Sequence, residues 1–193
     1  MNPQALALSA SGDRVVFTDS GVGATVRVLW LGAPSNVTTL AGGATSGYAD
    51  GQGTSALFSN GIMGLALLAN SSVVVADKGN CRLRMVSPSG AVSTIAGNGT
   101  CASTVNGVGV DGPALSAAVL GDVYGVAVAG SASDLIFFSE HNLGCIRTLA
   151  GGTVSTLAGL CACSGACPST ASTDGVGSLA RFNQSRARQG CAQ

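Results

Sequence analysis

The chain has 193 residues, a formal net charge of zero and only 9% charged side chains. This balance provides no basic surface for nucleic acid or for an anionic membrane, so we expect neither as a partner. Apolar runs such as 62–69 are far shorter than the roughly 20 residues of a membrane-spanning helix. Abundant valine together with 29 glycines is typical of short buried strands joined by many turns.

An internal repeat organises the sequence. A strand-like segment that ends in Ala-Gly occurs three times, at 36–42, 91–97 and 153–159. An apolar run that ends in an acid precedes each copy, and the three acids are Asp19, Asp77 and Glu140. In the second and third copies an arginine, Arg84 or Arg147, follows the acid by seven residues, and in the first copy Arg27 follows by eight.

A third landmark is an Asp-Gly step that begins at Asp50, Asp111 and Asp174. An apolar residue follows each of these aspartates by eight positions, and a glycine follows the first two by fourteen, at Gly64 and Gly125. Glycines that allow a positive φ, and an aspartate that holds a turn, explain this loop without a ligand. We expect the apolar residues of the loop to pack between repeat units.

Each unit contains four short apolar runs separated by turn residues, with no sustained helical period. Four strands per unit, joined by a long link, indicate an all-β propeller of four-stranded antiparallel blades. We expect residues 1–193 to form one partial propeller. Its expected parts are blade 1 at about 4–42, blade 2 at about 60–97, blade 3 at about 122–159, and the leading loop of a fourth blade at 160–193.

The segment 77–84, followed by 87–90 and 92–97, resembles an NHL repeat, with Cys81 where that family has histidine. The resemblance covers most of the chain and implies fold rather than activity. Blade 1 departs most, at 21–25, and blade 3 has Glu140 in place of aspartate. Because propellers close with 4–8 blades, we interpret the three blades as a fragment of a larger protein. Assembly of partial propellers into a ring is the alternative.

Seven cysteines suggest an oxidising compartment. Blades 2 and 3 each have a cysteine at the start of the third strand and another after the fourth, and blade 1 has neither. We therefore expect the disulfides Cys81–Cys101 and Cys145–Cys161, with Cys163 as a rival for Cys161.

The short cluster Cys161, Cys163 and Cys167 lacks the second cysteine pair or the histidine of a zinc site. We favour a disulfide within this loop, such as Cys163–Cys167, and predict no metal site. Cys191 is left over. Acceptor sequons at Asn36, Asn70, Asn98 and Asn183 also fit the secretory pathway, although residues 1–6 show no signal peptide.

No residue stands out as catalytic, and no cofactor motif is present. The single histidine, His141, is expected to be a polar loop residue rather than part of a triad. We expect the repeated acids to accept hydrogen bonds from turn amides or to pair with Arg84 and Arg147. Trp30 and Tyr48 are candidates for an exposed binding surface.

The sequence favours a non-catalytic module that binds a protein or glycan partner through loops on a propeller face. The alternative is a fragment of a propeller enzyme, resembling gluconolactonases or amidating lyases, whose metal ligands lie mostly in missing blades. RNA binding, as in some NHL propellers, is disfavoured because the chain is neutral. We expect an extracellular or secretory location.

Overall fold

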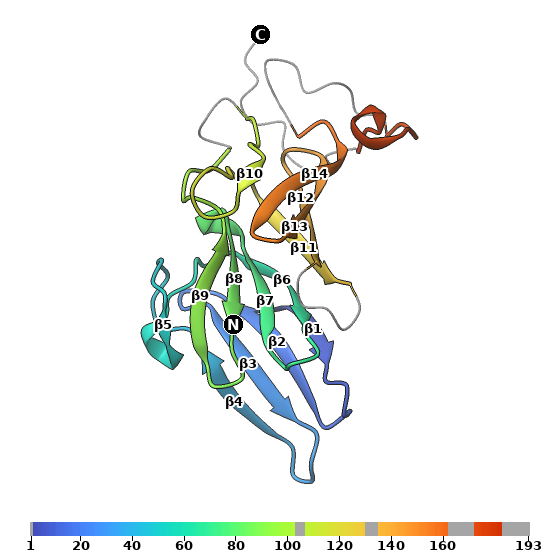
Figure 1. Ribbon diagram of the computed structural model, residues 1–193. Coiled ribbons are helices and arrows are strands. Elements are labelled where there is room, and N and C mark those ends of the chain that lie inside the picture. Colours follow the sequence, from blue (N-terminus) through green and yellow to red (C-terminus); the bar gives the residue numbers. More distant parts are fainter. Residues whose placement is uncertain (1, 103–106, 130–134, 162–171, 183–193) are drawn as a thin grey trace.

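The structure is a computed structural model that describes residues 2–102, 107–129, 135–161 and 172–182. Its regular elements in these ranges are strands and three-residue 3-10 turns, which confirms the predicted all-β fold class. The strands form three antiparallel sheets that follow one another along the chain (Figure 1). No helix in the described part has the length and apolar composition that a membrane span needs.

The first sheet, blade 1, has the order β1-β2-β3-β4. Its strands are β1 (Asn2–Leu8), β2 (Arg14–Ser20), β3 (Thr25–Trp30) and β4 (Asn36–Ala41). The buried residues of β2 and β3 alternate along the strands, so one face of blade 1 packs against blade 2.

Blade 2 contains β6 (Ile62–Leu67), β7 (Val73–Asp77), β8 (Arg82–Val86) and β9 (Ala91–Ala96). A fifth, two-residue strand, β5 (Gly51–Gln52), comes from the preceding loop and pairs with β9. β7 is buried at every position because blades 1 and 3 cover its two faces. This explains its unbroken run of apolar residues before the acid.

Blade 3 repeats this arrangement with β11 (Val123–Val128), β12 (Leu135–Glu140), β13 (Cys145–Ala150) and β14 (Thr153–Gly159). The short strand β10 (Gly112–Pro113) from the preceding loop pairs with β14, as β5 pairs with β9. The sequence did not predict these fifth strands. They fasten each inter-blade loop to the outer strand of the blade that it precedes.

The first strands of the blades, β1, β6 and β11, lie side by side and form the inner edge of the array (Figure 1). A hydrophobic core fills the space between blades 1 and 2, and a second core fills the space between blades 2 and 3. Short 3-10 turns follow β5 and β7, at Gly53–Ser55 and Lys78–Asn80, and a third lies at Gly177–Leu179.

The repeated Ala-Gly that closes the fourth strand has a backbone reason. Gly97 has a φ of 96°, and Gly42 and Gly159 have values of 108° and 90°. A Cβ at Gly97 would overlap the carbonyl oxygen of Cys81, which lies opposite at the start of the neighbouring strand. The repeat therefore requires glycine here both for its left-handed backbone and for the close approach of the chain.

The glycine of the inner strand has a different role. A Cβ at Gly64 on β6 would overlap the carbonyl oxygen of Tyr124 on β11. Gly64 thus allows the inner strands β6 and β11 to approach closely, so blades 2 and 3 are nearest to each other at their inner edge.

We expect Gly64→Ala to lower the free energy of unfolding by about 1–3 kcal/mol, because the added methyl group overpacks the contact between β6 and β11. Gly32→Ala is the matched control, since nothing lies within 4 Å of a Cβ at that position. Its effect should stay within about 0.5 kcal/mol. Denaturant unfolding of both variants measures the difference, and equal stabilities would contradict the close approach.

Candidate functional site

Arg84 on β8 is fully buried and joins three parts of the chain. Its Nη1 donates to Oδ2 of Asp77 on the neighbouring β7 at 2.8 Å, and its Nη2 donates to Oδ1 of Asp50 at 2.6 Å. Nη2 and Nη1 also donate to the carbonyls of Ala49 and Leu57, at 2.8 and 3.2 Å. The guanidinium therefore holds the inter-blade loop and β7 at the same time.

Blade 3 reproduces this network with the same arginine donors, but with a glutamate as the strand acid. Arg147 on β13 is fully buried and donates to Glu140 Oε1 at 3.0 Å and to Asp111 Oδ1 at 2.8 Å. Its Nε donates to the same Asp111 oxygen at 3.2 Å, and the carbonyls of Val110 and Val119 accept bonds from Nη2 and Nη1 at 2.6 and 3.0 Å. The repeated acids and loop aspartates singled out in the sequence thus meet at one arginine in each of blades 2 and 3.

The loop aspartate has a second partner on the outer strand. Asp50 Oδ2 accepts the backbone N–H of Thr94 at 3.0 Å, and Asp111 Oδ2 accepts that of Thr156 at 2.8 Å. The pairing of β8 with β9 shifts register beside Arg84, where the outer strand has one extra residue. This bulge points the Thr94 amide at the aspartate instead of at the sheet. The sequence predicts only a turn-holding role for this aspartate, and the bond to the outer strand is a further role.

One predicted equivalence was wrong by a residue. Val119 was matched with Phe58 because each lies eight positions after its aspartate. In the structure Val119 takes the place of Leu57, since both form the antiparallel bridge and both offer a carbonyl to the arginine. Leu120 therefore corresponds to the buried Phe58 and is itself fully buried. One extra residue in the loop after Asp111 causes the shift.

The remaining strand acid, Asp19, lies in blade 1, and the remaining loop aspartate, Asp174, lies in the last described segment. Asp19 on β2 pairs with Arg27 on β3, with Oδ2 3.1 Å from Nη1. Asp174 lies exposed in the segment 172–182, which has the same antiparallel bridge as the loop before blade 2.

Two disulfides occur, Cys81–Cys101 and Cys145–Cys161, the pairings that the repeat suggested. They close loops with separations of 20 and 16 residues, each worth roughly 3 kcal/mol in the chain-entropy model. Both join the start of the third strand to the beginning of the next inter-blade segment. Cys163, Cys167 and Cys191, with the proposed Cys163–Cys167 bond, lie outside the described residues.

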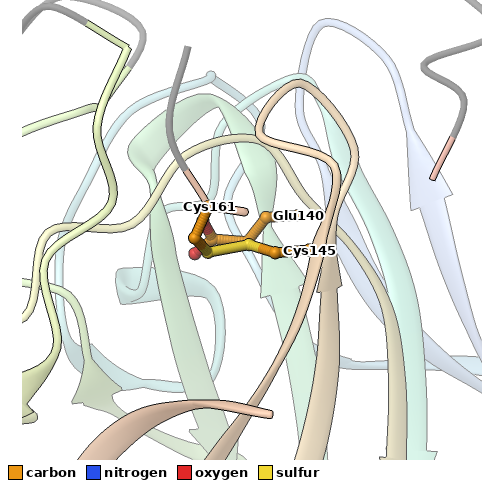
Figure 2. Close-up of side chains that lie close together, drawn as sticks. All are labelled: Glu140, Cys145 and Cys161. Atoms are coloured by element: carbon orange, nitrogen blue, oxygen red, sulfur yellow. A yellow bond between two sulfur atoms is a disulfide. The ribbon is translucent and has the colours of Figure 1, made fainter. Parts of the chain in front are cut away.

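A buried carboxyl lies beside the second disulfide. Glu140, Cys145 and Cys161 each place a possible ligand atom within 4.8 Å of the others (Figure 2). A cysteine binds metal as a thiolate, and these two sulfurs are bonded to each other. We therefore interpret the cluster as a disulfide packed against an acid, rather than as a metal centre.

Glu140 differs from Asp77 in how its second oxygen is used. Asp77 accepts the backbone N–H of Ser59 with Oδ1 and the Asn80 amide with Oδ2. Glu140 Oε2 is buried and has no hydrogen bond of ordinary geometry among the described residues, and the backbone of Gly121 gives the carboxyl only a minor stabilisation. Burial raises the pKa of the Glu140 carboxyl above its usual value of 4.5, against the opposing attraction of Arg147.

The raised pKa gives a pH dependence with a definite sign. The folded chain binds the proton of Glu140 more tightly than the unfolded chain does, so this contribution to stability is fully present below pH 4.5. It is lost as the pH rises through the raised pKa. As the pH rises from 4.5 through the raised pKa of Glu140, we expect the unfolding free energy of the wild type to fall relative to that of Glu140→Gln. Denaturant unfolding of both proteins, with their disulfides intact, measures this difference. Parallel pH profiles would contradict the assignment.

A cluster of polar and aromatic side chains lies between blades 2 and 3, on the turns that follow β7 and β12 and at the start of β11. Lys78 follows β7, His141 follows β12, and Asp122 and Tyr124 lie at the start of the inner strand β11. The Lys78 Nζ is 3.6 Å from Asp122 Oδ2 and 5.0 Å from the centre of the Tyr124 ring. The Tyr124 and His141 rings are 4.8 Å apart, centre to centre.

The backbone fixes this cluster in place. The Asp122 carbonyl accepts the N–H of His141 at 2.9 Å, and the Asn142 side chain accepts the N–H of Asp122 at the same distance. The four side chains are only partly buried, so the cluster presents a cation, an acid, a phenol and an imidazole on one surface. Such a set can donate and accept hydrogen bonds beside an aromatic face.

The cluster differs from the residues chosen from sequence. Tyr48 lies in the loop between β4 and β5, and its hydroxyl bonds Thr94 on the outer strand β9 at 3.0 Å. Trp30 ends β3 beneath the Arg14 guanidinium. Lys78 and Tyr124 were not predicted. A separate apolar hollow of about 340 Å³ opens between the outer parts of blades 2 and 3. Its lining consists of Met85, Thr94, Ile95, Leu115, Ile136, Leu149, Gly151 and Gly152.

No family model and no curated protein matches this sequence. Several solved structures match its fold. A structural genomics protein of unknown function from Bacteroides thetaiotaomicron has a TM-score of 0.68 and 22% identity over 94% of this chain and 40% of its own. An auxiliary nutrient binding protein from Bacteroides ovatus has a TM-score of 0.62 and 16% identity over 78% of this chain and 36% of its own.

A virginiamycin B lyase from Staphylococcus aureus matches with a TM-score of 0.50 and 14% identity, over 80% of this chain and 40% of its own. At such low sequence identities, similarity to these structures is evidence for a shared fold and not for a shared function. The present chain therefore has propeller-type blades, and it spans well under half the length of each of the three similar structures.

Proposed function

We propose that this chain is a non-catalytic binding module of the NHL-repeat type, and that its ligand is a glycan. The cluster of Lys78, Asp122, Tyr124 and His141 supports this proposal most directly. The exposed part of the Tyr124 phenol ring can pack against a sugar, and the surrounding charged and polar groups can form hydrogen bonds with its hydroxyls.

The position of the cluster supports a binding role. It lies on the turns after β7 and β12 and at the start of the inner strand β11, between blades 2 and 3, and rigid scaffolds commonly present binding residues in this way. Auxiliary nutrient binding proteins from two Bacteroides species are among the structurally similar chains. A virginiamycin B lyase is also similar, so an activity of the whole propeller is the second candidate.

An extracellular or secretory-pathway location accompanies this proposal. Two disulfides are typical of proteins that fold in an oxidising compartment. The acceptor asparagines Asn36, Asn70 and Asn98 are all exposed, as glycosylation would require.

A glycan array probed with the oxidised chain tests the proposal, followed by calorimetric titration of any retained oligosaccharide. We expect Tyr124→Ala to weaken binding by about tenfold or more, because it removes the aromatic face. Trp30→Ala is the matched control, since Trp30 is exposed on blade 1 away from the cluster, and should leave the affinity unchanged.

Three outcomes would overturn the glycan assignment. An array with no retained glycan would remove it, as would equal losses in the two variants. Chemical conversion of a retained oligosaccharide would favour the enzyme candidate instead.

A further inference from the structure

The acid at the end of the second strand has an unused oxygen in blade 3 but not in blade 2. Glu140 is 1% exposed, and its Oε2 has no hydrogen bond of ordinary geometry among the described residues. Asp77, its equivalent in blade 2, uses both oxygens. Its Oδ1 accepts the N–H of Ser59, and its Oδ2 accepts bonds from Asn80 and Arg84. A buried carboxylate oxygen without a partner is costly unless a positive group binds it.

Two sulfur atoms lie next to the unused oxygen. Glu140, Cys145 and Cys161 are all buried, and their possible ligand atoms lie within 4.8 Å of one another (Figure 2). Glu140 is opposite Cys145 in the pairing of β12 with β13, and Cys161 follows the end of β14. The carbonyl of Cys161 also accepts the N–H of Gly109, which fixes this residue to the inter-blade loop. The blade itself therefore holds the three side chains together.

Blade 2 has the equivalent disulfide but not the equivalent cluster. Cys81–Cys101 occupies the same place in its blade as Cys145–Cys161 does. Aspartate is one methylene group shorter than glutamate, and Asp77 forms no such group of ligand atoms with the two cysteines of its blade among the described residues. The two blades thus have matching cysteine pairs, and only blade 3 adds a carboxylate that is free to bind a cation.

We propose that Glu140, Cys145 and Cys161 bind Zn²⁺ when the two cysteines are thiols, with Glu140 Oε2 as the third protein ligand. The chain has this dithiol form before the disulfide closes, and a dithiol reductant restores it. In the reduction the sulfur–sulfur bond breaks, two electrons and two protons pass to the cysteines, and the two thiols of the reductant form a disulfide. Zinc then displaces the two thiol protons as the thiolates bind it.

The donor atoms and their spacing suit zinc. Zinc binds cysteine sulfur at about 2.3 Å and carboxylate oxygen at about 2.1 Å in a tetrahedron, so its ligand atoms lie roughly 3.6–3.8 Å apart. The ligand atoms of the cluster are already within 4.8 Å of one another. Small side-chain movements therefore suffice once the sulfur–sulfur bond has opened. Water takes the fourth position, as in other zinc sites with three protein ligands.

The charges of the site also balance. Two thiolates and one carboxylate carry three negative charges, and Zn²⁺ offsets two of them. Arg147 offsets the third, since its Nη1 is 3.0 Å from Glu140 Oε1 and leaves Oε2 for the metal. Asp111, the other acid beside Arg147, is 47% exposed, so water and salt screen its charge. This inference does not depend on the glycan-binding proposal.

Zinc titration of the reduced full chain tests the proposal, with a phosphine as the reductant and a chromophoric chelator as the competitor. The thiolates of Cys163, Cys167 and Cys191 are also potential zinc ligands, so all three are replaced by serine in every protein compared. We expect the reduced chain to bind Zn²⁺ at least tenfold more tightly than the oxidised chain. Cys145→Ser should remove this tight binding, and Cys81→Ser should retain it.

Substitutions of the two acids separate the blades. Glu140→Gln keeps the shape of the side chain but removes the charged ligand, so the Zn²⁺ affinity of the reduced chain should fall at least tenfold, the effect that even outer partners of a metal ligand have. Glu140→Asp gives blade 3 the shorter acid of blade 2 and should weaken binding as well. Asp77→Asn is the matched control in blade 2 and should leave the affinity unchanged.

Cobalt gives a spectroscopic check of the geometry, because Co²⁺ absorbs visible light strongly in the tetrahedral sites that zinc prefers. We expect these bands in the reduced chain and their loss in Cys145→Ser. Circular dichroism follows the fold of each reduced protein. Equal Zn²⁺ affinities of the reduced chain and both Glu140 variants would overturn the proposal, as would tight binding that survives Cys145→Ser. A reduced chain that is unfolded with and without Zn²⁺ would also overturn it, because the site requires the blade.

Discussion

A buried guanidinium in each of blades 2 and 3 joins two neighbouring strands of the blade to an inter-blade loop that lies much earlier in the sequence. Arg84 binds the acid of the neighbouring strand, the aspartate of the inter-blade loop and two carbonyls of that loop. Removing a charge from water is costly, and an arginine is tolerated inside a protein only when its donors are used. Substitution of Arg84 would leave Asp77 buried without its cation. The packing of loop against blade therefore depends on this one side chain.

The network also determines where the polar cluster lies. Arg147 holds the loop that connects blades 2 and 3 at Asp111, and the disulfide Cys81–Cys101 holds the same loop near its start. Asp122 and the first residues of β11 follow directly. A connection of this length would otherwise sample many conformations at an entropic cost. With both points fixed, the loop presents Tyr124 and its neighbours in one arrangement.

The repeat made the scaffold predictable. Copies at matching offsets indicated four strands per blade, the paired cysteines and the recurring acids. They did not reveal that Asp50 reaches across to Arg84, because periodicity places residues along a strand but not across a loop. The cluster was missed for the opposite reason. Lys78 and His141 follow the acids of successive blades at the same position, but they differ from copy to copy, and a repeat reveals only the positions that its copies share.

The central claim is that the loop aspartate and the strand arginine act as one unit, and a double-mutant cycle measures this directly. The unfolding free energies of the wild type, Asp50→Asn, Arg84→Met and the double variant give the coupling energy. We predict a favourable coupling of about 1–3 kcal/mol, the range for residues in one buried network. A coupling near zero, with additive effects of the two substitutions, would contradict the claim that Arg84 fastens the loop to the blade.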